Sequence, residues 1–222
     1  MLVKICGITR LEDAAAAVEL GAGAVGFILW PGSPRVVAAE RAREIVAGLP
    51  EGILAVGVFV NEDVDELNSL AERIGLTHVQ LHGDETPEYA GRVERPVIKA
   101  TSAFDADTVG GWRDDTTWLA DAHDPVRRGG TGRLADWDRA AQFARSHRVL
   151  LAGGLTPENV VNAIDTVRPY GIDVSSGVEI APGIKDRDRM RRLFEAIKAG
   201  DDKAGKAGRA GGPGRTGGAG KG

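Results

Sequence analysis

The sequence predicts a single (β/α)8 barrel, in which eight parallel strands close into a cylinder inside a ring of helices. Short β-rich runs alternate with helical patterns along the 222-residue chain. The alternation repeats eight times, and several of the strand candidates are almost entirely apolar. A doubly wound open sheet is the alternative, but such a sheet usually has fewer strands, and no Gly-x-Gly-x-x-Gly pattern follows the first strand.

The strand candidates are short runs rich in β-branched and other apolar residues. The run at 24–29 reads Ala-Val-Gly-Phe-Ile-Leu, which is typical of a parallel strand covered by helices on both faces. In order, the candidates span 2–6, 24–29, 53–59, 77–81, 96–100, 117–121, 148–152 and 171–175.

Helical patterns fill the intervals between these strands. Thr9 and Glu12 have the spacing of a capping box and mark the start of the first helix. The fifth pattern is the weakest, because two adjacent glycines precede its end. In order, the expected helices span 11–20, 38–49, 64–74, 87–93, 105–112, 136–146, 157–167 and 186–198.

The composition is that of a soluble globular protein, with 42% hydrophobic and 27% charged residues. A net charge of −4 gives no reason to expect a nucleic-acid partner. The chain shows neither a signal peptide nor an apolar stretch that could span a bilayer, so we expect a cytoplasmic protein that does not bind membranes. One cysteine excludes an internal disulfide and argues against a cysteine-rich zinc site.

The chain divides into a barrel domain over residues 1–199 and a tail over 200–222. The tail consists largely of Gly, Ala, Lys and Arg and contains no large apolar residue. Such a segment cannot bury enough surface to offset the entropy of ordering, so we expect it to be disordered. A polyanion-binding arm is the less favoured interpretation of its basic residues.

Polar residues or glycines follow nearly every predicted strand. In a barrel the carboxyl ends of the strands meet at one face, where active sites are built. We therefore expect these residues to converge on one site: Cys6, Arg35, Asn61, Gln80, His82, Lys99, Asp121, Gly153, Gly154, Ser175, Ser176 and Gly177.

The loops after the seventh and eighth strands suggest a phosphate site. Gly153-Gly154 precedes a helix start, and Ser175-Ser176-Gly177 forms a second loop of small residues. Glycines let the backbone approach an anion, and helix N-termini offer free N–H donors to it. Barrels often bind phosphate at this pair of loops, although each loop by itself could be an ordinary turn.

Each candidate side chain also has a structural interpretation. Arg35 could be a surface arginine or could form a bidentate pair with a carboxylate. For His82, packing or capping is the more common role of such a histidine, and for Lys99 a structural ion pair is favoured over an anion contact. Cys6 could be simply buried, and Asp121 could cap its loop.

Eight motifs along the chain match one enzyme family. The first is Lys4-Ile5-Cys6-Gly7-Ile8-Thr9. The others lie at 26–28 with 33–35, 56–61, 79–83, 97–100, 129–132 with 136–137, 151–155, and 173–179 with 182–186. Through these motifs the chain resembles, over residues 2–198, the phosphoribosylanthranilate isomerases, the barrel enzymes of tryptophan biosynthesis.

The resemblance implies an Amadori rearrangement of N-(5-phosphoribosyl)anthranilate. An acid protonates the ring oxygen as the furanose opens to an imine, and a base then removes the proton from C2 to give an enolamine that ketonises. In the family the base matches Cys6 and the acid matches Asp121, while Arg35 matches the residue that holds the anthranilate carboxylate. The reaction requires no metal and no cofactor.

We assign three further side chains to substrate binding, namely Gln80, His82 and Asp173. Asp121 is preferred to Asp124 as the acid because it closes the apolar run of the sixth strand. The chain departs from the family at Ala120, where a second leucine is usual, which is an apolar change away from the reacting groups.

The two catalytic roles require different pKa shifts. A free thiol is only a few per cent thiolate at neutral pH, so we expect a nearby helix N-terminus to favour the anion of Cys6. Burial or nearby negative charge should keep a proton on Asp121.

Other functions remain as alternatives. Another phosphosugar enzyme, such as an epimerase or indole-glycerol phosphate synthase, is disfavoured by a thiol at the end of the first strand. A dual isomerase that also serves histidine biosynthesis would be expected to carry paired aspartates. A non-catalytic phosphate-binding scaffold is disfavoured because Cys6, Asp121 and Arg35 occur together. Whether the chain is a monomer or a homodimer is left open by the sequence.

Overall fold

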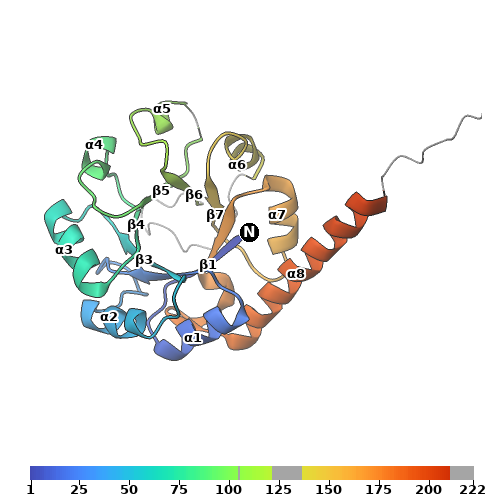
Figure 1. Cartoon of the computed structure of the whole chain (residues 1–222), viewed down its shortest axis with the longest axis horizontal. Coiled ribbons are helices and arrows are strands. Elements are labelled where there is room, and N and C mark those ends of the chain that lie inside the picture. Colours follow the sequence, from blue (N-terminus) through green and yellow to red (C-terminus); the bar gives the residue numbers. More distant parts are fainter. Residues whose placement is uncertain (105, 122–136, 211–222) are drawn as a thin grey trace, which may run out of the picture.

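A computed structural model of the chain contains the predicted barrel (Figure 1). The structure describes residues 1–104, 106–121 and 137–210. Eight parallel strands pair in chain order, and β1 pairs with β8 to close the cylinder. The strands are β1 (Leu2–Cys6), β2 (Ala24–Ile28), β3 (Leu54–Phe59), β4 (His78–Leu81), β5 (Val97–Thr101), β6 (Thr117–Ala120), β7 (Val149–Leu151) and β8 (Gly171–Val174).

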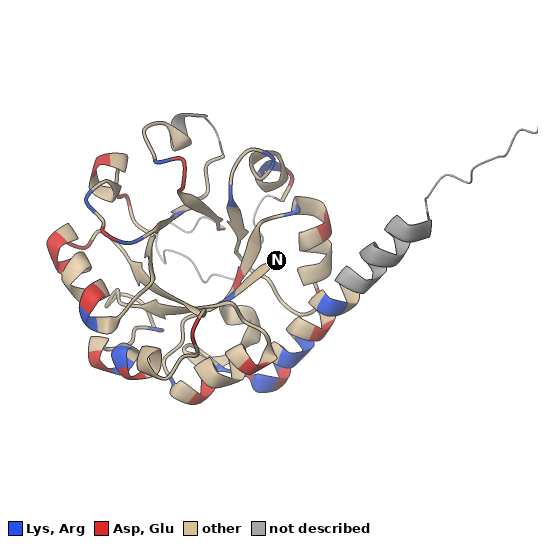
Figure 2. Ribbon diagram, in the orientation of Figure 1, with Lys and Arg blue, Asp and Glu red and all other residues tan. Residues whose placement is uncertain are grey.

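Helices surround the barrel, and charged residues of both signs lie along them (Figure 2). They are α1 (Leu11–Leu20), α2 (Ala39–Ala47), α3 (Val64–Ile74), α4 (Pro87–Ala90), α5 (Ala106–Val109), α6 (Trp137–Phe143), α7 (Val160–Val167) and α8 (Arg187–Ala210). The strands and helices therefore follow the predicted order. The helices α4 and α5 are shorter than the expected 87–93 and 105–112, and Asp136, the expected first residue of the sixth helix, lies outside the described residues.

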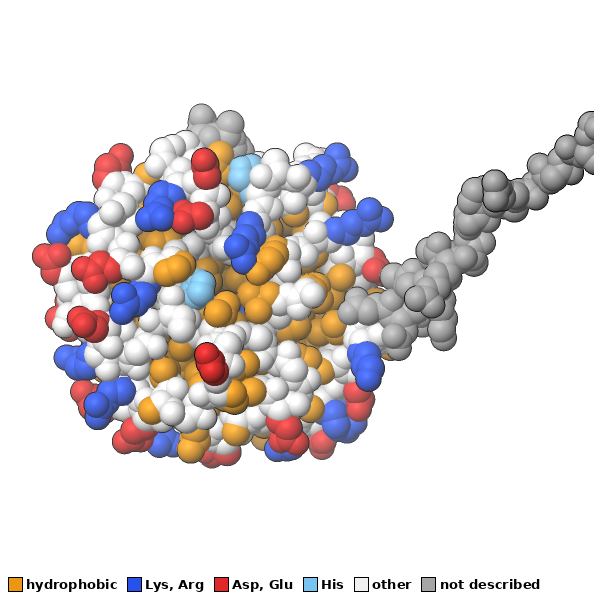
Figure 3. Space-filling view, in the orientation of Figure 1, with side chains coloured by type: hydrophobic (Ala, Val, Ile, Leu, Met, Phe, Trp, Pro, Cys, Tyr) orange, Lys and Arg blue, Asp and Glu red, His pale blue; other side chains and the backbone are white. Residues whose placement is uncertain are grey.

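Two apolar clusters hold the barrel together. The larger lies between the strands and the surrounding helices, and it includes Phe27, Leu67 and Leu193. The smaller lies among alternate residues of the strands, such as Val56, and fills part of the barrel interior. In Figure 3, charged side chains gather around the rim of the face shown, and apolar side chains occupy much of the area inside it.

The start of α1 differs from its prediction. Arg10 is the N-cap residue and makes no side-chain capping hydrogen bond. Instead of capping the helix, Thr9 donates its Oγ1 hydrogen bond to the carbonyl oxygen of Gly183 at 2.6 Å. The capping-box prediction is therefore wrong, because a contact from the far end of the chain takes the threonine hydroxyl.

Two small elements after β8 were not predicted. A 3-10 helix, η1 (Ser176–Val178), leads into a hairpin of β9 (Glu179–Ala181) and β10 (Ile184–Lys185). These segments are too short to produce a clear hydrophobic period, so sequence patterns do not reveal them. They nevertheless carry residues of the candidate site.

The last helix also differs from its prediction. α8 continues to Ala210, whereas the sequence predicted that this helix ends at 198. The segment from 199 to 210 has no large apolar residue with which to pack. It contains Ala, Lys and Arg, which have high intrinsic helix propensity and favour continuation of α8. Residues 211–222 lie outside the described part of the chain.

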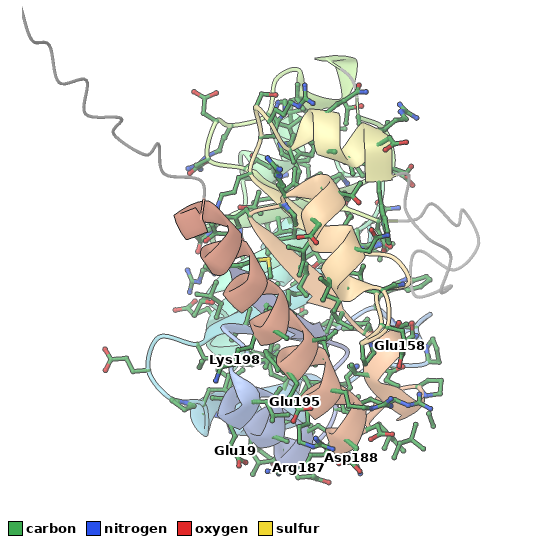
Figure 4. The ribbon with its side chains drawn as sticks, turned by 90° about the vertical axis from the view of Figure 1, so that its right-hand side faces the viewer. Glu19, Glu158, Arg187, Asp188, Glu195 and Lys198 are labelled. Carbon is green, nitrogen blue, oxygen red and sulfur yellow. The ribbon has the colours of Figure 1, made fainter. Side chains whose placement is uncertain are left out.

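At its N-terminal end, α8 is tied to the barrel by exposed ion pairs. Arg187 contacts Glu19 of α1 at 2.7 Å, and Arg192 contacts Glu158 before α7 at 3.4 Å. Figure 4 shows Arg187 and Glu19 side by side at the base of the helix. The buried side chains of Met190, Leu193 and Ile197 form the apolar face of α8.

Candidate active site

The predicted catalytic residues lie at the carboxyl ends of two barrel strands. Cys6 is the last residue of β1 and is 5% exposed. Asp121 directly follows β6, and its side chain is 14% exposed. Because all eight strands are parallel, both residues belong to the same face of the barrel.

A chain of polar side chains crosses the barrel interior below this face. The ammonium group of Lys4 donates to Asp173 Oδ1 at 2.9 Å and to Gln80 Oε1 at 3.0 Å. Gln80 Nε2 in turn lies 2.9 Å from His82 Nδ1. The structure thus brings together Gln80, His82 and Asp173, which the sequence assigned to substrate binding.

His82 extends this chain to the candidate acid. Its Nε2 atom lies 3.6 Å from Asp121 Oδ2, and its side chain is 13% exposed. When protonated, a histidine in this position can form an ion pair with the carboxylate. It can also hold Gln80 in a fixed orientation. His82 therefore has polar neighbours on both sides, which goes beyond the packing role suggested as its alternative.

Burial dominates the electrostatics of Cys6. It raises the pKa of the thiol above its usual range, and the Asp173 carboxylate acts in the same direction. The ammonium groups of Lys4 and Lys185 lower the pKa of the thiol but do not outweigh burial. The expectation of a thiol pKa lowered by a helix N-terminus is therefore wrong, because α1 begins only at Leu11 and the thiol is enclosed in the barrel.

Arg35 forms a bidentate ion pair with Glu179 of β9. Arg35 Nε donates to both carboxylate oxygens at 3.0 Å, and Nη2 donates to Oε2 at 2.8 Å. Lys185 Nζ also contacts Glu179 Oε1, at 2.8 Å. Burial opposes ionisation of Glu179, but Arg35 and Lys185 prevail and lower the pKa of its carboxyl group.

Lys185 joins the hairpin to the ends of β1 and β8. Its side chain is fully buried, and its Nζ donates to the backbone carbonyl oxygens of Cys6 and Ser175. Sequence analysis assigned no role to Glu179 or Lys185, although both lie in the motif at 173–179 with 182–186. Their position on an unpredicted hairpin explains why they were missed.

The two glycine-containing loops lie together, as the phosphate prediction requires. Gly153 and Gly154 have φ angles of +86° and +67°, which other residues rarely adopt. A Cβ atom on Gly177 would lie 1.8 Å from the carbonyl oxygen of Leu155, so only glycine permits this approach of the two loops.

A pocket of about 420 Å³ opens beside these loops. Of the five predicted phosphate residues, Gly154, Ser176 and Gly177 line it, whereas Gly153 and Ser175 do not. The other lining residues are Thr156, Pro157, Glu158, Arg189 and Arg192. The two arginines of α8 were missed, because the sequence placed them on a helix with no indication of which face would meet the loops.

Ser175 instead lies on the side of the site where Gly7 and Arg35 meet. Its Oγ atom is buried and has no hydrogen-bond partner among the described residues. A Cβ atom on Gly7 would lie 3.2 Å from this Oγ and 2.9 Å from Arg35 Cδ, so the hydroxyl and the arginine border the same narrow space. A buried hydroxyl without a partner is costly unless a ligand satisfies it.

Lys99 has the structural role that was favoured for it. Its Nζ lies 2.7 Å from Glu85 Oε2 and donates to the backbone of Gly83.

Two sequence features, the motif at 129–132 and the rival acid Asp124, lie outside the described residues. Within the described part, no group of three or more His, Cys, Asp or Glu side chains could hold a metal ion, and no helix is long and apolar enough to cross a membrane.

Comparisons with known proteins identify the family. The family of N-(5'phosphoribosyl)anthranilate (PRA) isomerases matches residues 3–196. The N-(5'-phosphoribosyl)anthranilate isomerase of Geobacter sulfurreducens is 50% identical over 198 residues, which cover 88% of this chain and 98% of that protein.

Solved structures agree with this match. The phosphoribosyl anthranilate isomerase of Thermotoga maritima, which is described as dimeric, superposes with a TM-score of 0.82 and 40% identity over 90% of this chain and all of that chain. A second structure, 39% identical with a TM-score of 0.79 and equal coverage, is a phosphoribosyl anthranilate isomerase in complex with reduced 1-(o-carboxyphenylamino)-1-deoxyribulose 5-phosphate. With its barrel, its motifs and these relatives, the chain belongs to the phosphoribosylanthranilate isomerase family.

Proposed function

We propose that this chain converts N-(5-phospho-β-D-ribosyl)anthranilate into 1-(2-carboxyphenylamino)-1-deoxy-D-ribulose 5-phosphate, with Cys6 as general base and Asp121 as general acid. One observation carries the proposal. Cys6 ends β1 and Asp121 directly follows β6 at the same barrel face, and a polar chain from Lys4 through Gln80 and His82 reaches Asp121. A thiol and a carboxyl group so arranged can act on opposite parts of one sugar.

The reaction divides between these two groups. Asp121 gives a proton to the ring oxygen as the C1–O bond breaks and the imine forms. Cys6, as the thiolate, then takes the proton from C2, and the electron pair of that C–H bond forms the enolamine. Ketonisation yields the product, so the substrate is isomerised without net oxidation. Asp121 must begin the reaction protonated and Cys6 must become a thiolate. Burial of Cys6 matters because it raises the pKa of the thiol and so disfavours the thiolate.

Arg35 is suited to hold the anthranilate carboxylate. Glu179 occupies the Nε and Nη2 edge of its guanidinium group. Arginine carries five N–H donors, and the Nη1 and Nη2 edge can bind a second carboxylate bidentately. Glu179 then positions Arg35 from one side while the substrate binds from the other. The Ser175 hydroxyl, which has no hydrogen-bond partner in the described part of the chain, borders this space and can donate to the same ligand.

The pocket at the β7 and β8 loops is suited to the 5-phosphate. Gly154, Ser176 and Gly177 offer backbone close to the ligand, and Arg189 and Arg192 add positive charge. The phosphate and carboxylate groups would thus anchor the two ends of the substrate, leaving the ribose between Cys6 and Asp121. Such anchoring converts binding energy into orientation of the reacting atoms.

All residues in this proposal come from one chain, so both a monomer and a homodimer can form the site. The absence of a nucleic-acid partner and a cytoplasmic location remain predictions from the sequence. Equilibrium sedimentation of the purified protein measures the oligomeric state directly.

The test uses the fluorescence of the anthranilate group. Adding the protein to freshly prepared phosphoribosylanthranilate is expected to abolish the substrate signal, and Cys6→Ser is expected to lower turnover by orders of magnitude. Binding of a reduced product analogue by Cys6→Ser should change little, because the serine hydroxyl replaces the thiol in shape. Failure of the wild-type protein to consume substrate would overturn the function, and unchanged turnover by Cys6→Ser would overturn the role of Cys6.

A further inference from the structure

Lys4 is a buried charged residue for which the proposed reaction gives no role. It precedes Cys6 by two residues on β1, so the two side chains lie on the same face of the strand. Its side chain is 0% exposed. Lysine is almost never fully buried without a specific partner, because removing an ammonium group from water is costly.

The Lys4 ammonium lies close to the Cys6 sulfur. Both atoms border Gly26 of β2, which is the register partner of Cys6. A Cβ atom on Gly26 would lie 2.8 Å from Cys6 Sγ and 3.0 Å from Lys4 Nζ. These two distances together limit the separation of sulfur and nitrogen to 5.8 Å. Because Gly26 has no Cβ atom, the Cys6 sulfur and the Lys4 ammonium can both approach its backbone.

Two hydrogen bonds fix the ammonium in place. Lys4 Nζ donates to Asp173 Oδ1 and Gln80 Oε1, which leaves one of its three N–H groups for a further acceptor. Burial opposes its charge, but Asp173 and Cys6 favour that charge, so the pKa of Lys4 stays above its usual value. Lys4 is therefore held in place beside the thiol, and its neighbours favour its charged form.

We propose that Lys4 is a positioning residue that stabilises the thiolate form of Cys6, the form needed for proton abstraction. The proposal rests on the proposed function, in which Cys6 is the base. An anion in a buried site needs a compensating charge, and a cation within about 4–6 Å favours the charged form of its neighbour by one to three pH units.

The other charged groups around the thiol do not replace Lys4. Asp173 on β8 opposes the thiolate, and Lys185 on β10 favours it with a smaller effect than Lys4. Lys185 Nζ is also committed to Glu179 and to the backbone carbonyl of Cys6. Among the described residues, Lys4 is thus the cation with the largest effect on the sulfur.

The test follows ionisation of the thiol itself. Cys6 is the only cysteine, so the rate of alkylation by iodoacetamide as a function of pH reports this residue alone in the full-length protein. In Lys4→Gln the midpoint of the profile is expected to rise by about one to two pH units. The control Lys99→Gln removes another buried, ion-paired lysine, and its midpoint should match the wild type.

An unchanged midpoint in Lys4→Gln would overturn the proposal. Alkylation needs no substrate, so this outcome is separate from that of the isomerase assay. If the isomerase assay succeeds, the alkaline rise of kcat/KM should move with the alkylation midpoint.

A second comparison covers the case in which Lys4→Gln does not fold because Asp173 is left without its cation. In Asp173→Asn the buried carboxylate is gone, and Lys4→Gln can be added without leaving it unpaired. The double variant should show a higher alkylation midpoint than Asp173→Asn alone, with the fold of both checked by circular dichroism. Equal midpoints in this pair would also exclude the proposed role.

Discussion

Glu179 holds the guanidinium group of Arg35 along a single edge, through hydrogen bonds of 2.8 to 3.0 Å. The two residues are 144 positions apart, and the contact joins the loop after β2 to the hairpin after β8. Arg35 is thereby fixed before any ligand arrives, and among the described residues no hydrogen bond is made by its Nη1 atom.

Glu179→Gln should weaken substrate binding more than turnover. The amide cannot hold Arg35 bidentately, so KM is expected to rise about tenfold, which corresponds to about 1.4 kcal/mol, while kcat changes less. Steady-state kinetics measure both constants. Glu44→Gln is a matched control, because Glu44 forms an exposed ion pair with Arg41 and its loss should change neither constant. An unaltered KM in Glu179→Gln would show that Arg35 does not depend on this partner.

Glu179 should also contribute to acid sensitivity. Its carboxyl pKa is lowered in the folded protein, so its stabilising effect is complete above the usual carboxyl range and is lost as the pH falls through the lowered value. The difference in unfolding free energy between wild type and Glu179→Gln should therefore shrink between pH 7 and pH 3. Urea unfolding at several pH values measures this difference, and a gap that stays constant with pH would contradict the prediction.

Activity should rise with pH through the neutral range. Burial raises the pKa of the Cys6 thiol, so the thiolate fraction at pH 7 is small and increases up to about tenfold per pH unit. We expect kcat/KM to follow this increase between pH 7 and 9. Initial rates in a series of buffers of equal ionic strength test it. A profile that is flat over this interval would mean that proton abstraction by Cys6 does not limit the rate.

Gly177→Ala should damage the phosphate pocket. The added Cβ atom would meet the backbone oxygen of Leu155 at 1.8 Å, so one of the two loops must move. We expect KM to rise tenfold or more and stability to fall by about 1–3 kcal/mol. Gly91→Ala is the control, since Gly91 has a helical φ of −63° and its nearest Cβ contact is 3.4 Å. Wild-type KM in Gly177→Ala would argue against a phosphate at these loops.

The sequence predicted the barrel because its strands are buried on both faces. A strand such as β2 is therefore apolar over its whole length, and its predicted and observed ends differ by one residue. The polar residues at strand ends were found for the same reason, since Cys6 and Asp121 interrupt or end apolar runs. Local sequence patterns were therefore sufficient to predict the elements whose burial is visible as an apolar run.

The sequence could not predict features that depend on contacts between distant segments. Thr9 has the spacing of a helix cap, but its hydroxyl bonds to Gly183. Glu179 and Lys185 lie on a hairpin whose strands have only two or three residues, and their partners Arg35 and Cys6 are far away in the chain. The raised pKa of the thiol likewise depends on enclosure by the whole barrel.

The seam between the first and last strands has a consequence for synthesis. Leu2 pairs with Gly171, and Lys4 contacts Asp173 across the same boundary. The cylinder can therefore close only after nearly the entire barrel has left the ribosome, because β1 pairs with β8, the last barrel strand to be synthesised. A chain terminated before β8 would lack this seam, together with η1 and the hairpin that carries Glu179 and Lys185. Enzyme activity would then also report that translation had passed β8.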